Sequence, residues 1–416
     1  MWVMALLLLH YHEMWLKGGN RSFFLHHFAV SIREQLGGLG PVRVELEDGR
    51  VLARLESEQA LAKAVDLVKR IFGVAYYAVA VEVERDLAAV EQAAVAHLAG
   101  ESFRTFAVRV RRADKTLPFR SHDAEQRLGR AILDWAAQAG RPISVHLSHP
   151  DVTCYVEFTS RRALVYSKKL PGRGGMASNT AGKLVCLLSG GYDSAVAAYK
   201  MMKRGARLIF VHFHGVAARA GEASEPVARE IVCTLVPYQG AARLYLVPFH
   251  ELQREVVLGA PESFRILIYR RLMLRIAEAI ARKQRALGLV VGDSLGQVAS
   301  QTLQNMAAVG AVARLPLYRP LAGDDKQEIL DLARRIGTYD ISSERFTDCC
   351  PVFLPRSPRL FATAEELDGA EASLDIPAMV RRGLDAARCE IYKFVDGRVI
   401  EAPSRRGAPS NAGQLV

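Results

Sequence analysis

The chain has 416 residues, of which 50% are hydrophobic and 24% charged. Domains average about 100–200 residues, so we expect several domains with their own cores, and intrinsic disorder is excluded as the main state. The longest apolar run, Met1–Leu9, is far shorter than the about 20 residues of a membrane span, and no basic segment precedes it. We therefore expect a cytoplasmic protein with no signal peptide and no contact with a membrane.

The first 165 residues predict two small α+β units. In the first unit, a strand (Val3–His10) and a helix (Ser22–Leu36) precede two alternating strands around the turn at Glu47–Gly49, and the unit is expected to end near residue 60. In the second unit, residues 61–165, we expect a strand at Tyr76–Val83, a helix at Leu87–Leu98 and a strand at Phe106–Val110.

Residues 166–182 are rich in glycine and basic side chains and predict a linker. From residue 183, uninterrupted apolar strands alternate with helices, which is typical of a parallel sheet covered on both faces. The expected strands are Leu184–Leu188, Leu208–Phe213, Leu244–Pro248 and Leu289–Gly292, and the expected helices are Ala195–Arg204, Pro226–Leu235, Phe264–Leu287, Gln297–Ala308 and Lys326–Ile336. Beyond Pro358 the chain becomes polar, and we expect a frayed tail there.

Charge and cysteine content narrow the classes of partner and cofactor. The formal net charge of +11 indicates a polyanionic partner, although a merely solvated basic surface remains open. Six cysteines without a C-x-x-C spacing argue against a disulfide framework and a zinc knuckle. His212 and His214 alternate along one strand, but no third ligand is evident, so we predict no protein-ligated transition-metal site.

The strongest chemical signal is the segment Ser189–Ser194, which lies between an apolar strand and a helix. Its two glycines let the backbone curl around an anion, and the N–H groups of the following helix add donors. Asp193 would repel a phosphate unless a cation lies between them, so we expect Mg²⁺ together with the nucleotide. The residues around Gly182-Lys183 do not match a Walker A loop, and Gly172–Ala177 precedes a strand where a dinucleotide fingerprint must follow one.

The segment Ser189–Ser194 resembles the PP-loop of the ATP pyrophosphatase superfamily. Further segments are similar, in the same order, to the tRNA 4-thiouridine synthetase family (ThiI): Leu16–Arg21, Arg111–Lys115, Tyr269–Met273, Gly292–Thr302, Arg319–Leu321, Asp325–Lys326 and Asp348–Cys350. The resemblance implies an α/β chain with a ferredoxin-like domain (1–60), a THUMP RNA-binding domain (61–165), the linker (166–182), a doubly wound, parallel-sheet PP-loop domain (183–365) and a C-terminal extension (366–416). The extension is too short for the rhodanese domain that some members carry.

The resemblance also implies the site residues. It assigns ATP contacts to Leu187, Leu188, Ser189, Gly190, Gly191, Ser194, His212, Phe213, Arg270, Gly292 and Gln301. Catalytic roles are implied for Asp193, Lys326 and Cys350, which accepts a persulfide sulfur, and for Cys349. We expect Arg109, Arg111, Arg112 and Lys115 at a strand end to contact tRNA phosphates, although a solvated strand end is the alternative.

The activity implied is ATP-dependent adenylation of a tRNA uridine, position 8, at O4, followed by replacement of the oxygen with sulfur to give 4-thiouridine. A cysteine desulfurase would supply the persulfide, and a homodimer is expected. The thiol that resolves the persulfide stays open among Cys349, Cys186, Cys233, Cys389 and an external thiol, and an iron–sulfur cluster on Cys233, Cys349 and Cys350 is a further alternative. Alternative functions are a PP-loop synthetase acting on another tRNA base or a small metabolite, a tRNA-binding module with a degenerate site, and a sulfur-carrier step in thiamine thiazole synthesis.

Overall fold

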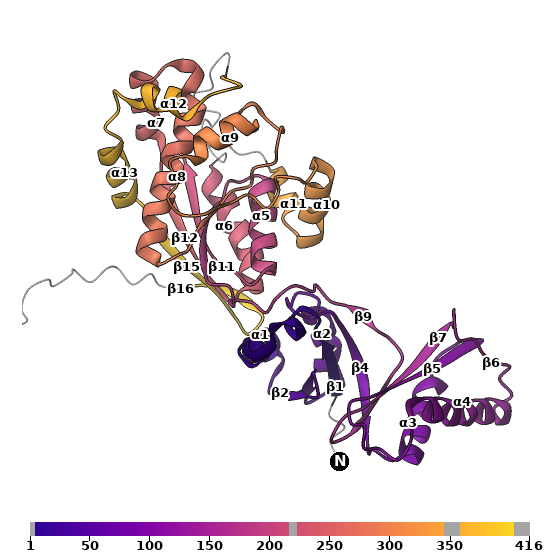
Figure 1. The fold of residues 1–416 in the computed structure, drawn as a ribbon. Coiled ribbons are helices and arrows are strands. Elements are labelled where there is room, and N and C mark those ends of the chain that lie inside the picture. Colours follow the sequence, from indigo (N-terminus) through magenta and orange to yellow (C-terminus); the bar gives the residue numbers. More distant parts are fainter. Residues whose placement is uncertain (1–4, 216–222, 345–357, 403–416) are drawn as a thin grey trace, which may run out of the picture. The chain divides into compact units, whose positions relative to one another are not determined.

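In the computed structural model, the described residues are 5–215, 223–344 and 358–402 (Figure 1). The chain divides into two compact units, Met1–Ala177 and Ser178–Val416. Each unit is built on its own sheet. Within the described ranges no helix is both long and apolar enough to cross a bilayer.

The first half of unit one is a βαββαβ arrangement. Its strands β1 (Ala5–His10), β2 (Val42–Glu47), β3 (Arg50–Leu55) and β4 (Tyr76–Val83) form an antiparallel sheet in the order β2-β3-β1-β4. Helices α1 (Arg21–Leu36) and α2 (Glu58–Val68) pack their apolar side chains, such as Ile32 and Ala64, against Leu7 and Leu9 of the central strand. A short 3-10 segment (Glu13–Asn20) joins β1 to α1. This order of elements is that of a ferredoxin-like domain.

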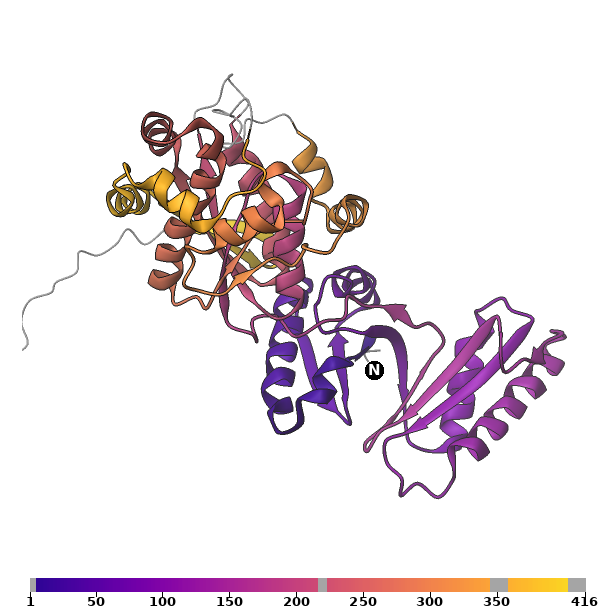
Figure 2. The ribbon, with the colours of Figure 1, turned by 45° about the horizontal axis from the view of Figure 1, so that its top comes forward.

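The second half of unit one continues the same sheet through β4. Strands β5 (Thr105–Arg112), β6 (Ser144–Val145), β7 (Val152–Phe158) and β8 (Ala163–Tyr166) follow in the order β4-β8-β7-β5-β6. Helices α3 (Leu87–Ala99) and α4 (Ser121–Gln138) lie side by side along these strands (Figure 2). Both helices bury one apolar stripe at a spacing of four residues, as in Val90, Ala94 and Leu98, because residues four apart share a helix face.

The predicted internal boundaries differ from the positions of these elements. Residue 60 lies within α2, and the core of the ferredoxin-like half extends to Tyr77 of β4. Part of the predicted linker is ordered in unit one, because β9 (Leu170–Pro171) pairs with β4 and Met176 packs in the same core. A boundary near residue 60 misses this because a hydrophobic pattern alone does not tell which sheet a helix covers.

Unit two contains the predicted parallel sheet. Five strands are parallel in the order β14-β13-β10-β11-β12, with bounds β10 (Lys183–Leu187), β11 (Arg207–His214), β12 (Ala241–Pro248), β13 (Leu289–Val290) and β14 (Leu317–Tyr318). The helices are α5 (Tyr192–Lys203), α6 (Ser224–Leu235), α7 (His250–Gly259), α8 (Arg265–Gln284), α9 (Leu303–Gly310), α10 (Lys326–Ile336) and α11 (Tyr339–Ser343), with short 3-10 turns at Val236–Tyr238, Glu262–Phe264 and Ala299–Gln301. The doubly wound fold predicted from the alternation of apolar strands and helices is confirmed.

The expected frayed tail beyond Pro358 is wrong for residues 359–402. Helices α12 (Ala364–Glu371) and α13 (Ile376–Asp385) bury Leu367 and Met379 in the core of unit two. Strands β15 (Arg388–Val395) and β16 (Arg398–Ala402) extend the sheet, and β15 pairs antiparallel with β12. The segment reads as polar because its elements are half-exposed at an edge of the domain, where few positions need apolar side chains.

Candidate nucleotide-binding site

The segment between β10 and α5 forms a closed loop. The Ser194 hydroxyl, in the first turn of α5, accepts a hydrogen bond from the backbone N–H of Ser189 (3.1 Å) and lies 3.1 Å from the Ser189 carbonyl. The Ser189 hydroxyl accepts from the N–H of Gly191 (3.2 Å). The N-cap residue of α5 is Gly191, which has no side chain to satisfy the N–H groups of the first turn, so these groups are available to an anion. The loop therefore has the shape and donors of a phosphate cradle.

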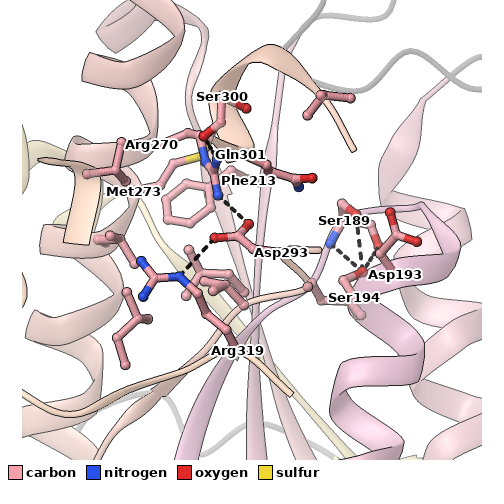
Figure 3. A pocket seen from close by; sticks show the side chains of 18 of the residues that line it. Ser189, Asp193, Ser194, Phe213, Arg270, Met273, Asp293, Ser300, Gln301 and Arg319 are labelled. Atoms are coloured by element: carbon pink, nitrogen blue, oxygen red, sulfur yellow. Dashed lines mark hydrogen bonds and ion pairs between the residues drawn. The ribbon is translucent and has the colours of Figure 1, made fainter. Parts of the chain in front are cut away.

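A cavity of about 360 Å³ opens beside this loop. Of the residues predicted for the site, it brings together Leu187, Leu188, Ser189, Asp193, Ser194, Phe213, Arg270, Gly292 and Gln301 (Figure 3). They come from the carboxyl ends of β10, β11 and β13, from α5 and α8, and from the 3-10 turn at Ala299–Gln301. The carboxyl ends of the strands are where ligands of open α/β sheets bind. The walls between the polar groups are apolar, with Ile266, Met273 and Val309 among them, and such a surface suits a flat aromatic ring.

Gly292 allows a close approach between β13 and the loop. A Cβ atom at this position would lie 2.7 Å from the backbone nitrogen of Ser194 and 2.8 Å from the carbonyl carbon of Asp193. Since both are backbone atoms, neither can move aside without shifting the helix. The glycine is therefore required by the packing of the site.

His212, which was predicted to contact ATP, does not lie at the cavity surface. It is fully buried and does not line the cavity. Its Nδ1 atom lies 2.8 Å from the carbonyl oxygen of Leu188, which can only accept, so Nδ1 donates; its Nε2 atom lies 2.9 Å from the Ser224 hydroxyl. His212 thus fixes Leu188 from behind the cavity. Gly190 and Gly191 lie in the loop and shape it without lining the cavity.

Two charged side chains meet at the edge of the loop. The Lys326 ammonium donates to Asp193 Oδ1 (2.8 Å), and the Gln297 amide donates to Asp193 Oδ2 (3.0 Å). Lys326 is the first residue of α10, whose start is fixed because Asp325 and Glu328 form a reciprocal capping box. The local sequence therefore places this lysine beside the phosphate cradle. Gln297 was missed by the sequence reasoning.

The opposite side of the cavity carries an arginine–aspartate–arginine group that the sequence reasoning also missed in part. Arg270 and Arg319 each donate to one oxygen of Asp293, the Arg319 bond being 3.3 Å long. Arg270 also donates to the Ser300 carbonyl (3.0 Å), and Arg319 to the Met306 carbonyl (2.8 Å). Asp293 directly follows Gly292 at a strand end, which is the one sequence signal that points to it. Figure 3 shows this group facing the loop side chains across the cavity.

The predicted sulfur carriers Cys349 and Cys350 lie outside the described residues. Among the described cysteines, Cys186 is fully buried, and burial raises the pKa of its thiol to about 12. Cys233 and Cys389 are half-buried, and burial raises the pKa of both thiols. Because the thiolate is the reactive form, these positions disfavour a role in sulfur exchange.

The four residues predicted to bind RNA lie at and after the end of β5. Arg111 and Lys115 are exposed. Arg109 donates to the Leu147 carbonyl (2.6 Å), and Arg112 donates to the carbonyls of Leu117 (3.3 Å) and Phe119. Arg109 and Arg111 line a surface pocket of about 410 Å³ together with Lys169 and Tyr155. The structure therefore groups cations with an aromatic ring in one basic surface of the domain.

A closed Ser-Gly-Gly loop at the switch point of a parallel sheet, carried by a chain with a ferredoxin-like domain, defines a PP-loop ATP pyrophosphatase-type protein. Comparison with known proteins agrees with this class. Family models match residues 6–78 (ThiI ferredoxin-like domain), 84–168 (THUMP domain) and 179–376 (Thiamine biosynthesis protein, ThiI).

Curated relatives cover nearly the whole chain. A probable tRNA sulfurtransferase of Thermus thermophilus is 39% identical over 393 residues, covering 94% of this chain and 95% of the relative, and one of Moorella thermoacetica is 38% identical over 380 residues, covering 91% and 95%. A crystal structure of a 4-thiouridine synthetase–RNA complex with bound ATP superposes with a TM-score of 0.82 at 30% identity, covering 93% of this chain and 99% of that chain. The chain belongs to the ThiI family of tRNA sulfurtransferases.

Proposed function

We propose that the chain is an ATP-dependent tRNA sulfurtransferase that adenylates a uridine, position 8, at O4 and replaces the oxygen with sulfur to give 4-thiouridine. The observation that carries the proposal is the cavity beside the Ser189–Ser194 loop, which combines a phosphate cradle with apolar walls. The solved structure of a related 4-thiouridine synthetase with RNA and bound ATP supports RNA and ATP as the ligands of this chain.

The residues around the cavity suit adenylation. The loop N–H groups and Lys326 would hold the β- and γ-phosphates and stabilise the charge that develops on the leaving pyrophosphate. Leu187, Leu188, Phe213, Gly292, Arg270 and Gln301 would enclose the adenosine. A magnesium ion fits beside Asp193, because Mg²⁺ is usually held by one or two carboxylates together with phosphates and water. When bound there, it would neutralise phosphate charge.

The second step is sulfur transfer through Cys350. Its terminal persulfide sulfur attacks C4, AMP leaves from C4, and a second thiol then breaks the sulfur–sulfur bond and forms a disulfide with Cys350. The burial of Cys186 makes Cys349 or an external thiol the better resolving group. A cysteine desulfurase would recharge Cys350, and the protein would act as a homodimer.

Arg109, Arg111, Arg112 and Lys115 would contact tRNA phosphates. Phosphate contacts provide affinity and orientation without reading sequence, which suits an enzyme acting on many tRNAs of one shape. The exposed positions, Arg111 and Lys115, can approach a phosphate directly. Arg109 and Arg112 are held by backbone carbonyls and would support the surface.

The test is a nucleoside digest of unmodified tRNA incubated with the protein, ATP, Mg²⁺ and a cysteine desulfurase with cysteine, analysed by mass for 4-thiouridine. We expect product that requires ATP and disappears with Cys350→Ser. Product that needs ATP and survives Cys350→Ser would overturn the persulfide step and keep adenylation. No thiouridine with wild-type protein that binds both ligands would overturn the proposal.

A sulfur-carrier step in thiazole synthesis is the second candidate function, favoured by the description of the family model that matches residues 179–376. That step would use Cys350 without adenylating RNA. Asp193→Asn would then abolish thiouridine and leave sulfur delivery to the thiazole unchanged, whereas Cys350→Ser would abolish both.

A further inference from the structure

The position of Asp293 is fixed on both sides of its backbone. Gly292, which precedes it, packs so closely against the start of α5 that a Cβ atom there would collide with backbone atoms. The hydroxyl of Ser294, which follows it, donates to the Asp324 carbonyl (3.0 Å). Asp293 itself is only 5% exposed. Its carboxylate is therefore held at a set place relative to the Ser189–Ser194 loop.

This carboxylate anchors two guanidinium groups that line the cavity. Arg270 donates to one of its oxygens, and Arg319 donates to the other (Figure 3). The second contact of Arg270 is the Ser300 carbonyl (3.0 Å), and its side chain is 17% exposed. A long arginine side chain has many rotamers in solution, and these two contacts select one of them. Arg270 is therefore held in one conformation before a nucleotide binds.

The charge of Asp293 and its contacts predict opposite effects on ATP binding. A carboxylate in the cavity repels the phosphates of ATP, so its charge alone would weaken binding. Its contacts would strengthen binding, because they keep Arg270 where the nucleotide needs it. They also hold two like-charged guanidinium groups on one anion, and without the carboxylate these groups would repel each other. The sign of the effect of removing Asp293 thus distinguishes its two possible contributions.

We propose that Asp293 is a positioning residue for nucleotide binding, which acts by holding Arg270 at the distance from the Ser189–Ser194 loop that ATP requires. In the proposed function Arg270 encloses the adenosine, and the loop holds the phosphates that leave as pyrophosphate. Asp293 therefore controls the affinity for the adenosine end of ATP and not the affinity for pyrophosphate. The inference rests on the proposed function and adds to it a residue that acts through another side chain.

The first test compares Asp293→Asn with wild type in the binding of ATP, AMP and pyrophosphate, each with Mg²⁺ and without tRNA. The dissociation constants for ATP and AMP are expected to rise about tenfold, as when a charged hydrogen bond is lost. That for pyrophosphate is expected to change by less than about twofold. Asp293→Glu, which keeps the carboxylate, is expected to recover part of the affinity for AMP.

Two results of this test would overturn the proposal. Tighter binding of ATP by Asp293→Asn would mean that the carboxylate acts through its charge alone. An equal loss of affinity for AMP and pyrophosphate would mean that the substitution disturbs the loop as a whole. If wild-type protein bound no ATP, the proposed function would fail together with the inference, whereas unchanged binding by Asp293→Asn would overturn the inference alone.

A double-mutant cycle tests whether Asp293 acts through Arg270. Arg270→Gln is expected to weaken AMP binding about tenfold or more, and Asp293→Asn added to it is expected to weaken binding by less than a further twofold. A further tenfold loss in the double variant would overturn the proposal. Asp368→Asn is the matched control, because Asp368 accepts from Arg271, the next residue of α8, and does not line the cavity.

A second measurement uses wild-type protein, so it does not depend on the folding of a variant. A crystal structure with AMP is expected to show Arg270 in contact with the nucleotide while it keeps its bonds to Asp293 and to the Ser300 carbonyl. An Arg270 side chain that leaves Asp293 when AMP binds would overturn the proposal. So would a direct hydrogen bond between Asp293 and AMP with no contact from Arg270.

Discussion

The two charged regions of the chain are built differently. Around the cavity of unit two, charged side chains pair with one another: Asp293 with two arginines, and Asp193 with Lys326. At the end of β5 in unit one, Arg111 and Lys115 are exposed. Fixed dipoles and charges serve a chemical step because they need no reorganisation when charge develops. Exposed cations serve docking, since the phosphates of a nucleic acid are themselves mobile and hydrated.

This difference predicts which measurements each region controls. Changes at the cavity should alter rates by large factors and be insensitive to salt. Changes at β5 should alter tRNA affinity by smaller factors that depend on salt, because exposed charges are screened. Variants whose effects do not follow this division between reaction rate and tRNA affinity would contradict the comparison of the two regions.

The largest effect is expected for Lys326→Gln. It removes the cation that lies 2.8 Å from Asp193 at the edge of the loop, and loss of one group that stabilises developing charge costs about 100- to 1,000-fold in rate. The measurement is tRNA-dependent pyrophosphate release, with Lys393→Gln, an exposed lysine of the same unit, as the control. A fall of less than threefold would place Lys326 outside the chemistry.

Gly292→Ala should have the next largest effect. The new Cβ would lie 2.7 Å from the Ser194 nitrogen, and overpacking of this kind costs about 1–3 kcal/mol. We expect a lower unfolding temperature and weaker ATP binding, whereas the matched change Gly323→Ala meets no atom within 4 Å and should be nearly neutral. Equal unfolding temperatures for the two variants would contradict the described packing of the loop.

The double variant Arg111→Ala, Lys115→Ala tests the exposed cations at the end of β5. If each contacts one phosphate, the slope of log affinity for tRNA against log salt should fall by about 2, and affinity at physiological salt by about tenfold. ATP binding should be unchanged. Arg130→Ala, on the exposed face of α4, is the control. A salt slope equal to that of wild type in the double variant would mean that Arg111 and Lys115 do not contact tRNA phosphates.

The smallest effect is expected for Asp325→Ala. The Asp325 carboxylate accepts from the Glu328 N–H (2.9 Å) and caps α10, and loss of such a cap costs about 1 kcal/mol. Thermal unfolding should show this loss. Because the same helix start carries Lys326, we also expect a modest fall in pyrophosphate release; unchanged stability would mean that the cap is not formed in solution.

The sequence predicted the parts of the fold that depend on local pattern. The strand–loop–helix around Ser189–Ser194, the helix α8 and the start of α10 at Lys326 each carry their signal within a few residues, and the structure has them where they were expected. The family resemblance assigned Phe213 and Gly292 to the ATP site, and both line the cavity because parallel strands end at one edge of a sheet.

What the sequence could not predict depends on contacts between distant positions. Asp293 meets Arg319 across 26 residues, and Gln297 reaches Asp193 across 104, with no periodicity that links either pair. The pairing of β15 with β12 is equally non-local, so the sequence predicts a tail where a half-exposed strand lies one place from the edge of the sheet. The buried position of His212 could not be told from that of a ligand-binding histidine, since both stand at the end of a strand.

The most direct test of adenylation follows the oxygen atom at C4 of the target uridine. The tRNA is prepared with ¹⁸O at O4 of that uridine and incubated with the protein, unlabelled ATP, Mg²⁺ and a persulfide source, and the AMP formed is analysed by mass. If O4 attacks the α-phosphorus, one ¹⁸O atom must appear in AMP for each 4-thiouridine made. Unlabelled AMP accompanying 4-thiouridine would contradict adenylation at O4.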